Sequence, residues 1–418
     1  MDYSLFGQKF TRHAGITQLM DDLNQGLQNP NAIMLGGGNP AVIPEMQTAF
    51  NQQLGKQLGS GELLQALANY DGPKGKNSFT EALAALLQRE YGWAISARNI
   101  ALTNGSQTAF FYLFNLLAGD FATTKKKVLF PLAPEYIGYA DSALSEEMFV
   151  AGKPSISLLE NGLFKYHIDF EQLEVGDDIG LICVSRPTNP TGNVLTDEEI
   201  RHLYEIAQAR GIPLLIDNAY GTPFPNIIFS DVTPFWNDNT ILCMSLSKLG
   251  LPGARCGIVI APESIIDALG NLSGIINLAP GGIGPTLMQP WVENGEIIRL
   301  SQDVIRPFYE QRAWQTVTKL QDAIPAPRLR IHKPEGALFL WLWFEGLPIH
   351  SQELYLRLKE QGLILVPGHY FFPGITDTGW RHQQECMRLN YAQHPDVVSA
   401  GVDILAKTIG NLDHLWRN

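Results

Sequence analysis

The feature that most constrains the fold is an alternation of apolar runs with helix-like stretches between about residues 100 and 260. The runs are VLFPLAP, GLICVSRP, IPLLIDNAY, TILCMSLS and CGIVIAP, and each is rich in β-branched and other apolar residues. Strands that alternate with helices in this way form a mostly parallel sheet covered by helices on both faces. The loops at the carboxyl ends of such strands build the binding site, so the polar residues there are the first candidates for function.

The remainder of the chain predicts a second, smaller folding unit. With 418 residues the chain exceeds the usual size of one hydrophobic core. Its last third should form a long helix through VIRPFYEQRAWQTVTKL, a strand at ALFLWLWF, a helix at ELYLRLKEQG and a short strand at LILVP. We therefore predict a large α/β domain over residues 46–300 and a smaller α+β domain from residues 1–45 and 301–418.

Charge and composition argue against several classes of partner. The formal net charge is -12, and the one run of lysines, residues 125–127, is far short of the basic stripe that a nucleic-acid partner would need. The longest apolar run, residues 337–344, is too short to span a bilayer, and the N-terminal MDYSLFGQKFTRHAG lacks the pattern of a signal peptide. These features predict a protein without a nucleic-acid or membrane partner.

The metal-ligating residue types show no recognisable motif. The four cysteines have neither CxxC pairing nor regular spacing, which disfavours a disulfide framework or a zinc site and favours a reducing compartment. The nine histidines include no HExxH pair. We therefore expect a cytoplasmic protein without a bound metal.

The central signal is Ser245-Leu246-Ser247-Lys248, which closes an apolar strand and is followed by Arg255 in GLPGARCG. A lone lysine is usually solvated, because an ammonium group is costly to bury. Here hydroxyl groups and an arginine flank the lysine, and they can coordinate a phosphate dianion. A desolvated lysine beside cationic groups has a lowered pKa and can condense with an aldehyde. This context favours a site for a phosphorylated aldehyde such as pyridoxal phosphate (PLP), bound to Lys248 as a Schiff base.

Polar residues follow two other strands of the predicted sheet. IPLLIDNAYG ends with Asp217 and Tyr220, and LICVSRP runs into a turn that contains Asn189. A carboxylate or an amide in such places can simply cap a loop. In a PLP site the Asp would keep the pyridine nitrogen protonated, and Asn189 and Tyr220 could bond the phenolic oxygen of the ring.

A glycine turn before a predicted helix offers a further phosphate site. The sequence LTNGSQTAFFYLFNLLAG places Ser106 and Gln107 in the first turn of that helix. A serine at this position is often only a helix cap. The same geometry presents unpaired backbone N–H groups and the positive end of the helix dipole to an anion.

In this order, GSQ, NPTG, the Asp-x-x-Tyr strand end and SxSK resemble the hallmarks of the class I and II aminotransferases, which are PLP enzymes of fold type I. The resemblance covers essentially the whole chain. It implies a large domain with a mostly parallel sheet covered by helices, a smaller α+β domain, and a homodimer with shared active sites. It also implies that Lys248 is catalytic and that the following residues bind the cofactor: Ser106, Gln107, Tyr136, Asn189, Asp217, Tyr220, Ser245, Ser247, Arg255 and, across the dimer interface, Tyr70.

The resemblance also implies how substrates bind. Arg388 in CMRLNYA matches the arginine that holds the substrate carboxylate through two parallel hydrogen bonds, and Gly38 in LGGGNP matches a backbone contact to the same group. Spacing alone leaves a surface salt bridge open for the arginine and a simple turn open for the glycine. GHYFFPG and FGQKFTRHAG are candidate walls of the side-chain pocket by family position.

The stretches LGGGNPA, YDGPKGK, PLAPEYIGYA, NLAPGGIGP and KPEGALFLWLWF resemble the branch of the family that exchanges an amino group between L-valine and pyruvate. The implied products are 3-methyl-2-oxobutanoate and L-alanine. The alternatives are another aminotransferase of the kynurenine/aminoadipate type, in which the phosphate arginine also follows the lysine by seven residues, and a carbon–sulfur lyase on the same scaffold. A non-catalytic PLP-sensing module is a further class, which the extent of the aminotransferase-like sequence disfavours.

Overall fold

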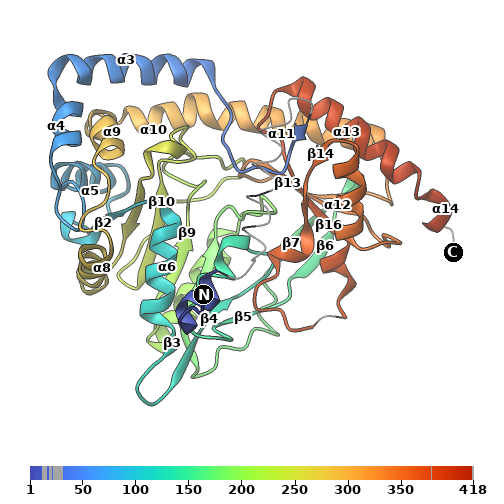
Figure 1. Cartoon of the computed structure of the whole chain (residues 1–418), viewed down its shortest axis with the longest axis horizontal. Coiled ribbons are helices and arrows are strands. Elements are labelled where there is room, and N and C mark those ends of the chain that lie inside the picture. Colours follow the sequence, from blue (N-terminus) through green and yellow to red (C-terminus); the bar gives the residue numbers. More distant parts are fainter. Residues whose placement is uncertain (12–16, 18–20, 22–31, 378, 417–418) are drawn as a thin grey trace.

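The computed structural model of the chain describes residues 1–11, 17, 21, 32–377 and 379–416. Its described strands form an eight-stranded sheet, a six-stranded sheet and a two-stranded sheet. In Figure 1 the eight-stranded sheet lies on the left and in the centre, and the strands of the six-stranded sheet lie toward the right with the C-terminal helices. The fold-class prediction of an α/β protein with helix-covered sheets is confirmed.

The eight-stranded sheet is built from the apolar runs that the sequence singles out. Its central strands β4, β8, β9 and β10 are parallel, while β11, β2 and β3 join antiparallel at the two ends. In spatial order the strands are β2 (Ile100–Thr103), β11 (Gly257–Ile260), β10 (Thr240–Ser245), β9 (Leu214–Asp217), β8 (Ile179–Ser185), β4 (Lys125–Phe130) and β3 (Gly119–Asp120), with β5 (Phe149–Ala151) paired to β4.

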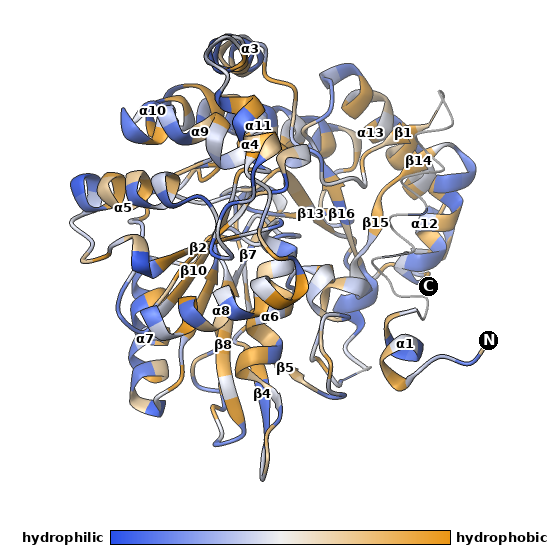
Figure 2. Ribbon diagram, turned by 60° about the vertical axis from the view of Figure 1, so that its left-hand side comes forward, coloured by the Kyte–Doolittle hydropathy of each residue, from blue (hydrophilic) through white to orange (hydrophobic). Residues whose placement is uncertain are grey.

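Both faces of this sheet are buried, which explains why its strands are almost continuously apolar. Along β9, Leu214 and Ile216 belong to one hydrophobic core cluster, and the intervening Leu215 belongs to the other. The hydropathy colouring of Figure 2 shows these apolar strands inside a shell of more polar helices. Helices of this part of the chain are α1 (Leu5–Phe10), α3 (Pro44–Ser60), α4 (Glu62–Ala68), α5 (Asn77–Tyr91), α6 (Ser106–Leu117), α7 (Asp197–Arg210), α8 (Glu263–Ile276), α9 (Ile283–Glu293) and α10 (Glu296–Leu300).

The six-stranded sheet combines the end of the chain with two strands from its middle. In spatial order its strands are β15 (Val366–Pro367), β16 (Cys386–Asn390), β13 (Phe339–Trp343), β12 (Arg330–His332), β7 (Leu163–His167) and β6 (Ser155–Leu158). The two-stranded sheet pairs β1 (Ile33–Met34) with β14 (Leu363–Ile364). The division of the chain at residues 46 and 300 stays a prediction. That prediction did not foresee that β6 and β7 join the C-terminal strands.

The C-terminal elements follow the predicted pattern. The long helix is α11 (Arg306–Ala323), which continues a turn of π-helix at Ser301–Ile305, and it is followed by α12 (Ser351–Glu360), α13 (Pro395–Gly410) and α14 (Asp413–Trp416). Single turns of 3₁₀ helix lie at Ala97–Asn99, Ile137–Tyr139, Glu160–Gly162, Pro252–Ala254, Gly368–Phe371 and Arg381–Gln384.

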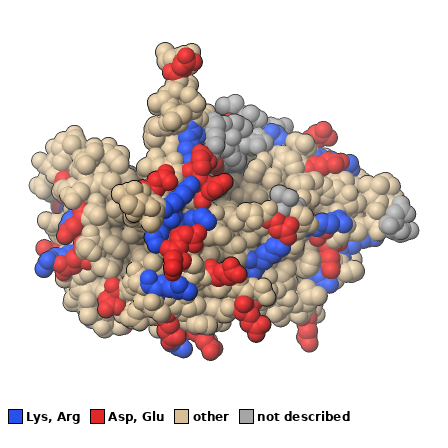
Figure 3. Space-filling model, turned by 90° about the horizontal axis from the view of Figure 1, so that it is seen from below, with Lys and Arg blue, Asp and Glu red and all other residues tan. Residues whose placement is uncertain are grey.

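Two surface features bear on partners. No helix among the described residues has both the length and the apolar character needed to cross a membrane. The face drawn in Figure 3 carries acidic and basic side chains interspersed with one another.

Candidate active site

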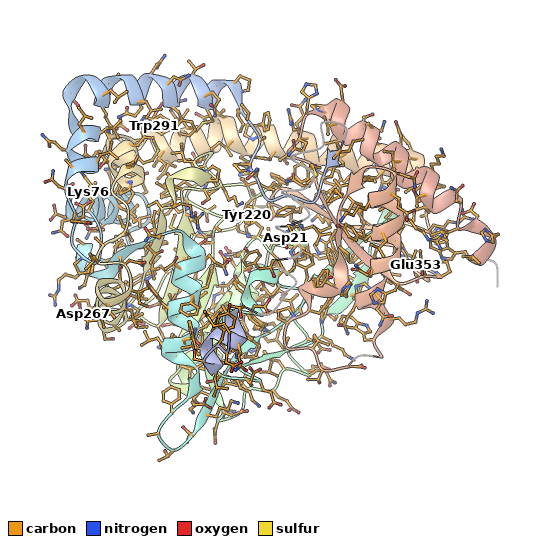
Figure 4. The ribbon with its side chains drawn as sticks, viewed as in Figure 1. Asp21, Lys76, Tyr220, Asp267, Trp291 and Glu353 are labelled. Carbon is orange, nitrogen blue, oxygen red and sulfur yellow. The ribbon has the colours of Figure 1, made fainter. Side chains whose placement is uncertain are left out.

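A cavity of about 500 Å³ lies at the carboxyl edge of the large sheet. Because β8, β9 and β10 are parallel and in register, the loops that follow them meet at this edge. Tyr220, which lines the cavity, lies near the middle of the molecule in Figure 4. The cavity gathers these sequence-predicted residues: Gly38, Ser106, Gln107, Tyr136, Asn189, Asp217, Tyr220, Ser245, Ser247, Lys248, Arg255 and Arg388.

Lys248 follows the end of β10, and its side chain enters the cavity. Its Nζ donates a hydrogen bond to the Gly38 carbonyl at 2.6 Å and lies 5.3 Å from the centre of the Tyr220 ring. Burial, together with the positive charges of Arg388 and Arg255, lowers the pKa of the Lys248 amine to about 8, although the negative charge of Asp217 opposes this shift. A substantial fraction of this amine is therefore neutral near pH 8.

Asp217 ends β9 and is 9% exposed. Its Oδ1 accepts a hydrogen bond from the Ala219 N–H at 3.0 Å, and its Oδ2 accepts one from the Tyr139 hydroxyl at 2.6 Å. Burial raises the pKa of Asp217 to about 6, while these two hydrogen bonds and the charge of Lys248 hold it down. The carboxylate is consequently ionised at neutral pH.

The anion-binding end of the cavity is formed by the start of α6 and by Arg255. The guanidinium packs so closely on Gly105 that a Cβ there would lie 2.2 Å from Arg255 Nη2, and Gly105 has φ +86°. On the other side, a Cβ on Gly257 would lie 2.6 Å from the Ser106 nitrogen. The first-turn N–H groups of a helix lack intrahelical acceptors, so Ser106 and Gln107 present free donors beside a guanidinium.

Arg388 lies on β16 and is 2% exposed. Its Nη1 donates to Asn189 Oδ1 at 2.7 Å and its Nη2 donates to the Gly36 carbonyl at 2.6 Å. The guanidinium lies 4.1 Å from the ring centre of Phe339 and 5.1 Å from that of Phe371, which belongs to GHYFFPG. Burial lowers the pKa of Arg388 to about 10, so it remains a cation at neutral pH. Both hydrogen-bond acceptors are neutral, and a substrate carboxylate would be a stronger one.

Tyr70 is the one predicted site residue that does not line the cavity. Its side chain is 86% exposed, in the segment after α4. The predicted role of Tyr70 needs a second subunit and stays a prediction. Residues 12–15 of FGQKFTRHAG lie outside the described residues.

Sequence reasoning missed several residues around the cavity. Phe110, Ile137, Pro187 and Ala219 line it. Each of them lies within three residues of a predicted site residue in the sequence. This closeness in sequence is the signal that could have identified them. A second missed group lies beneath the cavity, where Tyr139 bonds Asp217.

The residue set fits PLP. This cofactor carries a phosphate, a pyridine nitrogen, a phenolic oxygen and an aldehyde. The cavity offers a suitable partner for each group: Arg255 with the start of α6, the ionised Asp217, the donors Asn189 and Tyr220, and the amine of Lys248. Among the described residues no group of three or more His, Cys, Asp and Glu could hold a metal ion.

Comparisons with known proteins agree with this chemistry. The family model of aminotransferase class I and II matches residues 31–403. A valine–pyruvate aminotransferase of Escherichia coli K12 is 60% identical over 410 residues, which cover 98% of this chain and 98% of that protein. The crystal structure of a valine–pyruvate aminotransferase from Salmonella typhimurium LT2 is 57% identical, with a TM-score of 0.89, and the match covers 97% of this chain and 100% of that one.

A more distant structure shares the fold. The aspartate aminotransferase of Thermus thermophilus with maleate has a TM-score of 0.79 at 20% identity, covering 98% of this chain and 100% of that one. The cavity geometry, the family match over most of the chain and the 60% identical relative lead to one conclusion. This chain belongs to the class I and II aminotransferases, which are PLP-dependent enzymes.

Proposed function

We propose that this chain transfers the amino group of L-valine to pyruvate, giving 3-methyl-2-oxobutanoate and L-alanine. The observation that carries the proposal is the convergence of Lys248, Asp217 and Arg388 in one cavity. The near full-length likeness to valine–pyruvate aminotransferases supports the choice of substrates. An apolar pocket separates side chains that differ by one methylene by only about 1–3 kcal/mol, so related aliphatic amino acids should compete with valine.

The cofactor-binding residues are proposed to act on separate parts of PLP. Ser106, Gln107, Ser245, Ser247 and Arg255 would hold the phosphate, since all five line the cavity, Ser106 and Gln107 begin α6, and Arg255 packs on Gly105 just before it. Ser245 is positioned for this by the Ser247 N–H, which donates to its Oγ at 3.0 Å.

The remaining residues would hold the ring. Tyr136 would stack on it, and Asn189 and Tyr220 would bond its phenolic oxygen. Burial raises the pKa of Tyr220, which therefore remains a hydroxyl donor at neutral pH. When bound, PLP supplies an aldehyde that links to amines and a ring that draws electrons from the substrate Cα.

Lys248 is the proposed acid and base. Because the pKa of its amine is lowered to about 8, the neutral Nζ can take a proton from the substrate Cα and, once protonated, can donate it again. The Gly38 carbonyl holds this amine at 2.6 Å inside the cavity. Asp217 stays ionised and would stabilise a proton on the pyridine nitrogen.

Arg388 is the proposed carboxylate site. Its guanidinium is already oriented by Asn189 and by the Gly36 carbonyl, and the rings of Phe339 and Phe371 shield it from water. A fixed, dry guanidinium loses little entropy when it binds a carboxylate through two parallel hydrogen bonds. Gly38 would add a backbone contact to the same group, because a glycine there leaves room beside Lys248.

The quaternary structure that we propose is a homodimer. Exposed apolar side chains lie on α4, where Leu64 and Leu67 are 61% and 65% exposed, and at the end of α8 and just after it, where Ile275 and Leu278 are 83% and 67% exposed. Tyr70 follows α4 by two residues. Large exposed apolar surfaces are typical of protein–protein interfaces. A second copy bound there would bring its Tyr70 toward the neighbouring phosphate site. The cytoplasm is the proposed location, which the four buried free cysteines support.

The test follows the visible absorbance of the purified holoenzyme while valine and then pyruvate are added. Valine alone should bleach the cofactor band and pyruvate should restore it. Lys248→Ala should abolish this cycle, whereas Lys127→Ala, which alters a surface ion pair with Asp178, should leave it unchanged. A Lys248→Ala variant that transaminates at the normal rate would refute the assignment of the base.

Product analysis separates the alternatives. A carbon–sulfur lyase would release ammonia and pyruvate from a thioether amino acid without any acceptor. An enzyme of the kynurenine/aminoadipate type would prefer those donors to valine in direct competition.

A further inference from the structure

A buried chain of polar side chains lies beneath Asp217. It links Glu135, in the loop after β4, to Ser185 at the end of β8, then to Tyr139 and finally to Asp217. Glu135 is 1% exposed and Ser185 is 2% exposed. The proposed function gives no role to the first three residues of this chain, and a carboxyl group buried so deeply requires a physical account.

The contacts of Glu135 suit a neutral carboxylic acid. Its Oε1 accepts from the Ser185 N–H at 2.9 Å, and its Oε2 lies 2.5 Å from the Ser185 Oγ. Within the described part of the chain, no lysine, arginine or histidine forms an ion pair with Glu135, and the charged side chain that acts on its pKa is the negative Asp217. A second buried carboxylate without a cation would be strongly disfavoured there. Burial raises the pKa of Glu135 to about 8, and the charge of Asp217 contributes to the rise, whereas the two Ser185 contacts and a backbone hydrogen bond from Tyr136 oppose it.

Tyr139 is held firmly with its hydroxyl toward Asp217. Its ring stacks on Phe130 at 5.5 Å and meets Phe110 and Phe114 edge-on at 5.0 and 5.2 Å. Its hydroxyl donates to Asp217 Oδ2 at 2.6 Å and lies 3.4 Å from the Ser185 Oγ. Burial and neighbouring negative charge raise the pKa of Tyr139 well above its ordinary value, so this hydroxyl remains a donor.

The hydrogen bonds of this chain can therefore all be donated in one direction, from Glu135 toward Asp217. A protonated Glu135 donates to the Ser185 Oγ, which frees the Ser185 hydroxyl to donate to Tyr139, and Tyr139 donates to Asp217. Chains of this kind polarise each member and strengthen the last hydrogen bond. If Glu135 were ionised instead, Ser185 would donate to Glu135, and a second negative charge would face Asp217.

We propose that Glu135 is a positioning residue that stays protonated and, through Ser185 and Tyr139, keeps Asp217 ionised opposite the pyridine nitrogen of the cofactor. The physical reason is that a carboxylate that loses a hydrogen-bond donor becomes a stronger base. A shared proton would then move from the ring nitrogen to Asp217. This inference rests on the PLP chemistry of the proposed function, but it does not depend on the identity of the amino acid.

The test uses PLP labelled with ¹⁵N in its ring. The label is loaded into the wild-type chain and into Tyr139→Phe, Glu135→Gln and Glu135→Leu variants, and ring-nitrogen protonation is read by NMR at neutral pH without substrate. Wild type and Glu135→Gln should give the protonated signal, because the amide can donate to Ser185 as the acid does. Tyr139→Phe and Glu135→Leu should shift toward unprotonated pyridine. The PLP dissociation constant should rise about tenfold in Tyr139→Phe, which loses one hydrogen bond to a charged group.

The matched control is Tyr166→Phe. Tyr166 is 1% exposed in the six-stranded sheet and bonds Trp341 and His382 away from the cavity, so the same deletion there should leave the NMR signal unchanged.

A wild-type signal from Tyr139→Phe would overturn the inference, and so would a Glu135→Gln variant whose ring nitrogen is unprotonated. If Glu135→Leu does not fold, the ring-nitrogen signals of Tyr139→Phe and Glu135→Gln still test the inference. A wild-type chain that binds no PLP would refute the proposed function instead.

Discussion

Replacing Arg388 with Lys keeps a cation in the cavity but removes the planar guanidinium. In the structure its two terminal nitrogens donate in separate directions, to Asn189 and to the Gly36 carbonyl. A lysine offers one compact ammonium group, so at least one charge-assisted hydrogen bond to the substrate carboxylate is lost. Such a bond contributes about 1.5–3 kcal/mol, which corresponds to a loss of about tenfold to a hundredfold in kcat/KM for valine.

The assay compares valine with 2-methylpropylamine, which is valine without its carboxylate. The wild-type enzyme should favour valine strongly, and Arg388→Lys should reduce that preference by the same factor by which it lowers kcat/KM for valine. The variant should still bind PLP and show a visible cofactor band, because Lys248 and the residues assigned to the phosphate are unchanged.

Arg330→Lys is the control for this substitution. Arg330 lies on β12 of the same sheet, outside the cavity, and forms an ion pair with Glu345, so its replacement should leave the kcat/KM values for both amines unaffected. If Arg388→Lys retained the wild-type preference for valine over the amine, the assignment of the carboxylate site would be wrong.

Two further predictions concern the cofactor end of the cavity. Burial raises the pKa of Asp217 from its ordinary value of 3.8 to about 6, so ionised Asp217 destabilises the apo chain above pH 6 by about 3 kcal/mol, and the effect disappears below pH 4. Asp217→Asn should therefore raise the free energy of unfolding of the apo chain at pH 7, less any loss of the Tyr139 hydrogen bond, but should not raise it at pH 3.5. The same substitution should lower the rate of transamination. Equal stability of the two chains at pH 7 would contradict this reasoning. Gly105→Ala should weaken PLP binding at least about tenfold in a fluorescence titration, since the new methyl group would collide with Arg255 at a positive φ. Gly253→Ala, where a Cβ meets nothing within 4 Å, should bind PLP normally.

The strand-end residues of the site could be predicted because their positions follow from local pattern. Asp217 and Lys248 each come directly after an apolar run, and parallel strands bring such ends to one edge whatever the details of packing. The turn that contains Asn189 could be placed beside them by the same argument. The start of α6 could be predicted because a glycine before an apolar helix is a local sequence signal.

Other features depended on contacts between segments far apart in the chain. The strand β7 pairs with β12, and β6 pairs with β7, although four strands of the large sheet and several helices lie between β7 and β12 in the sequence. β6 has four residues and β7 has five, and strands this short carry too little local pattern to indicate which sheet they join. The aromatic rings beside Arg388 also come from two distant segments, those of Phe339 and Phe371.

The sequence by itself determined the order of the elements, the parallel sheet and the chemical groups at its carboxyl edge, because these depend on short-range periodicity and strand direction. Only the tertiary structure decided how those groups are tuned. The Gly38 carbonyl holds Lys248, and Tyr139 and Glu135 act on Asp217 from beneath. Such couplings depend on burial and on distances of a few ångströms between residues that are far apart in the sequence. A local pattern of amino acids determines neither the burial nor these distances.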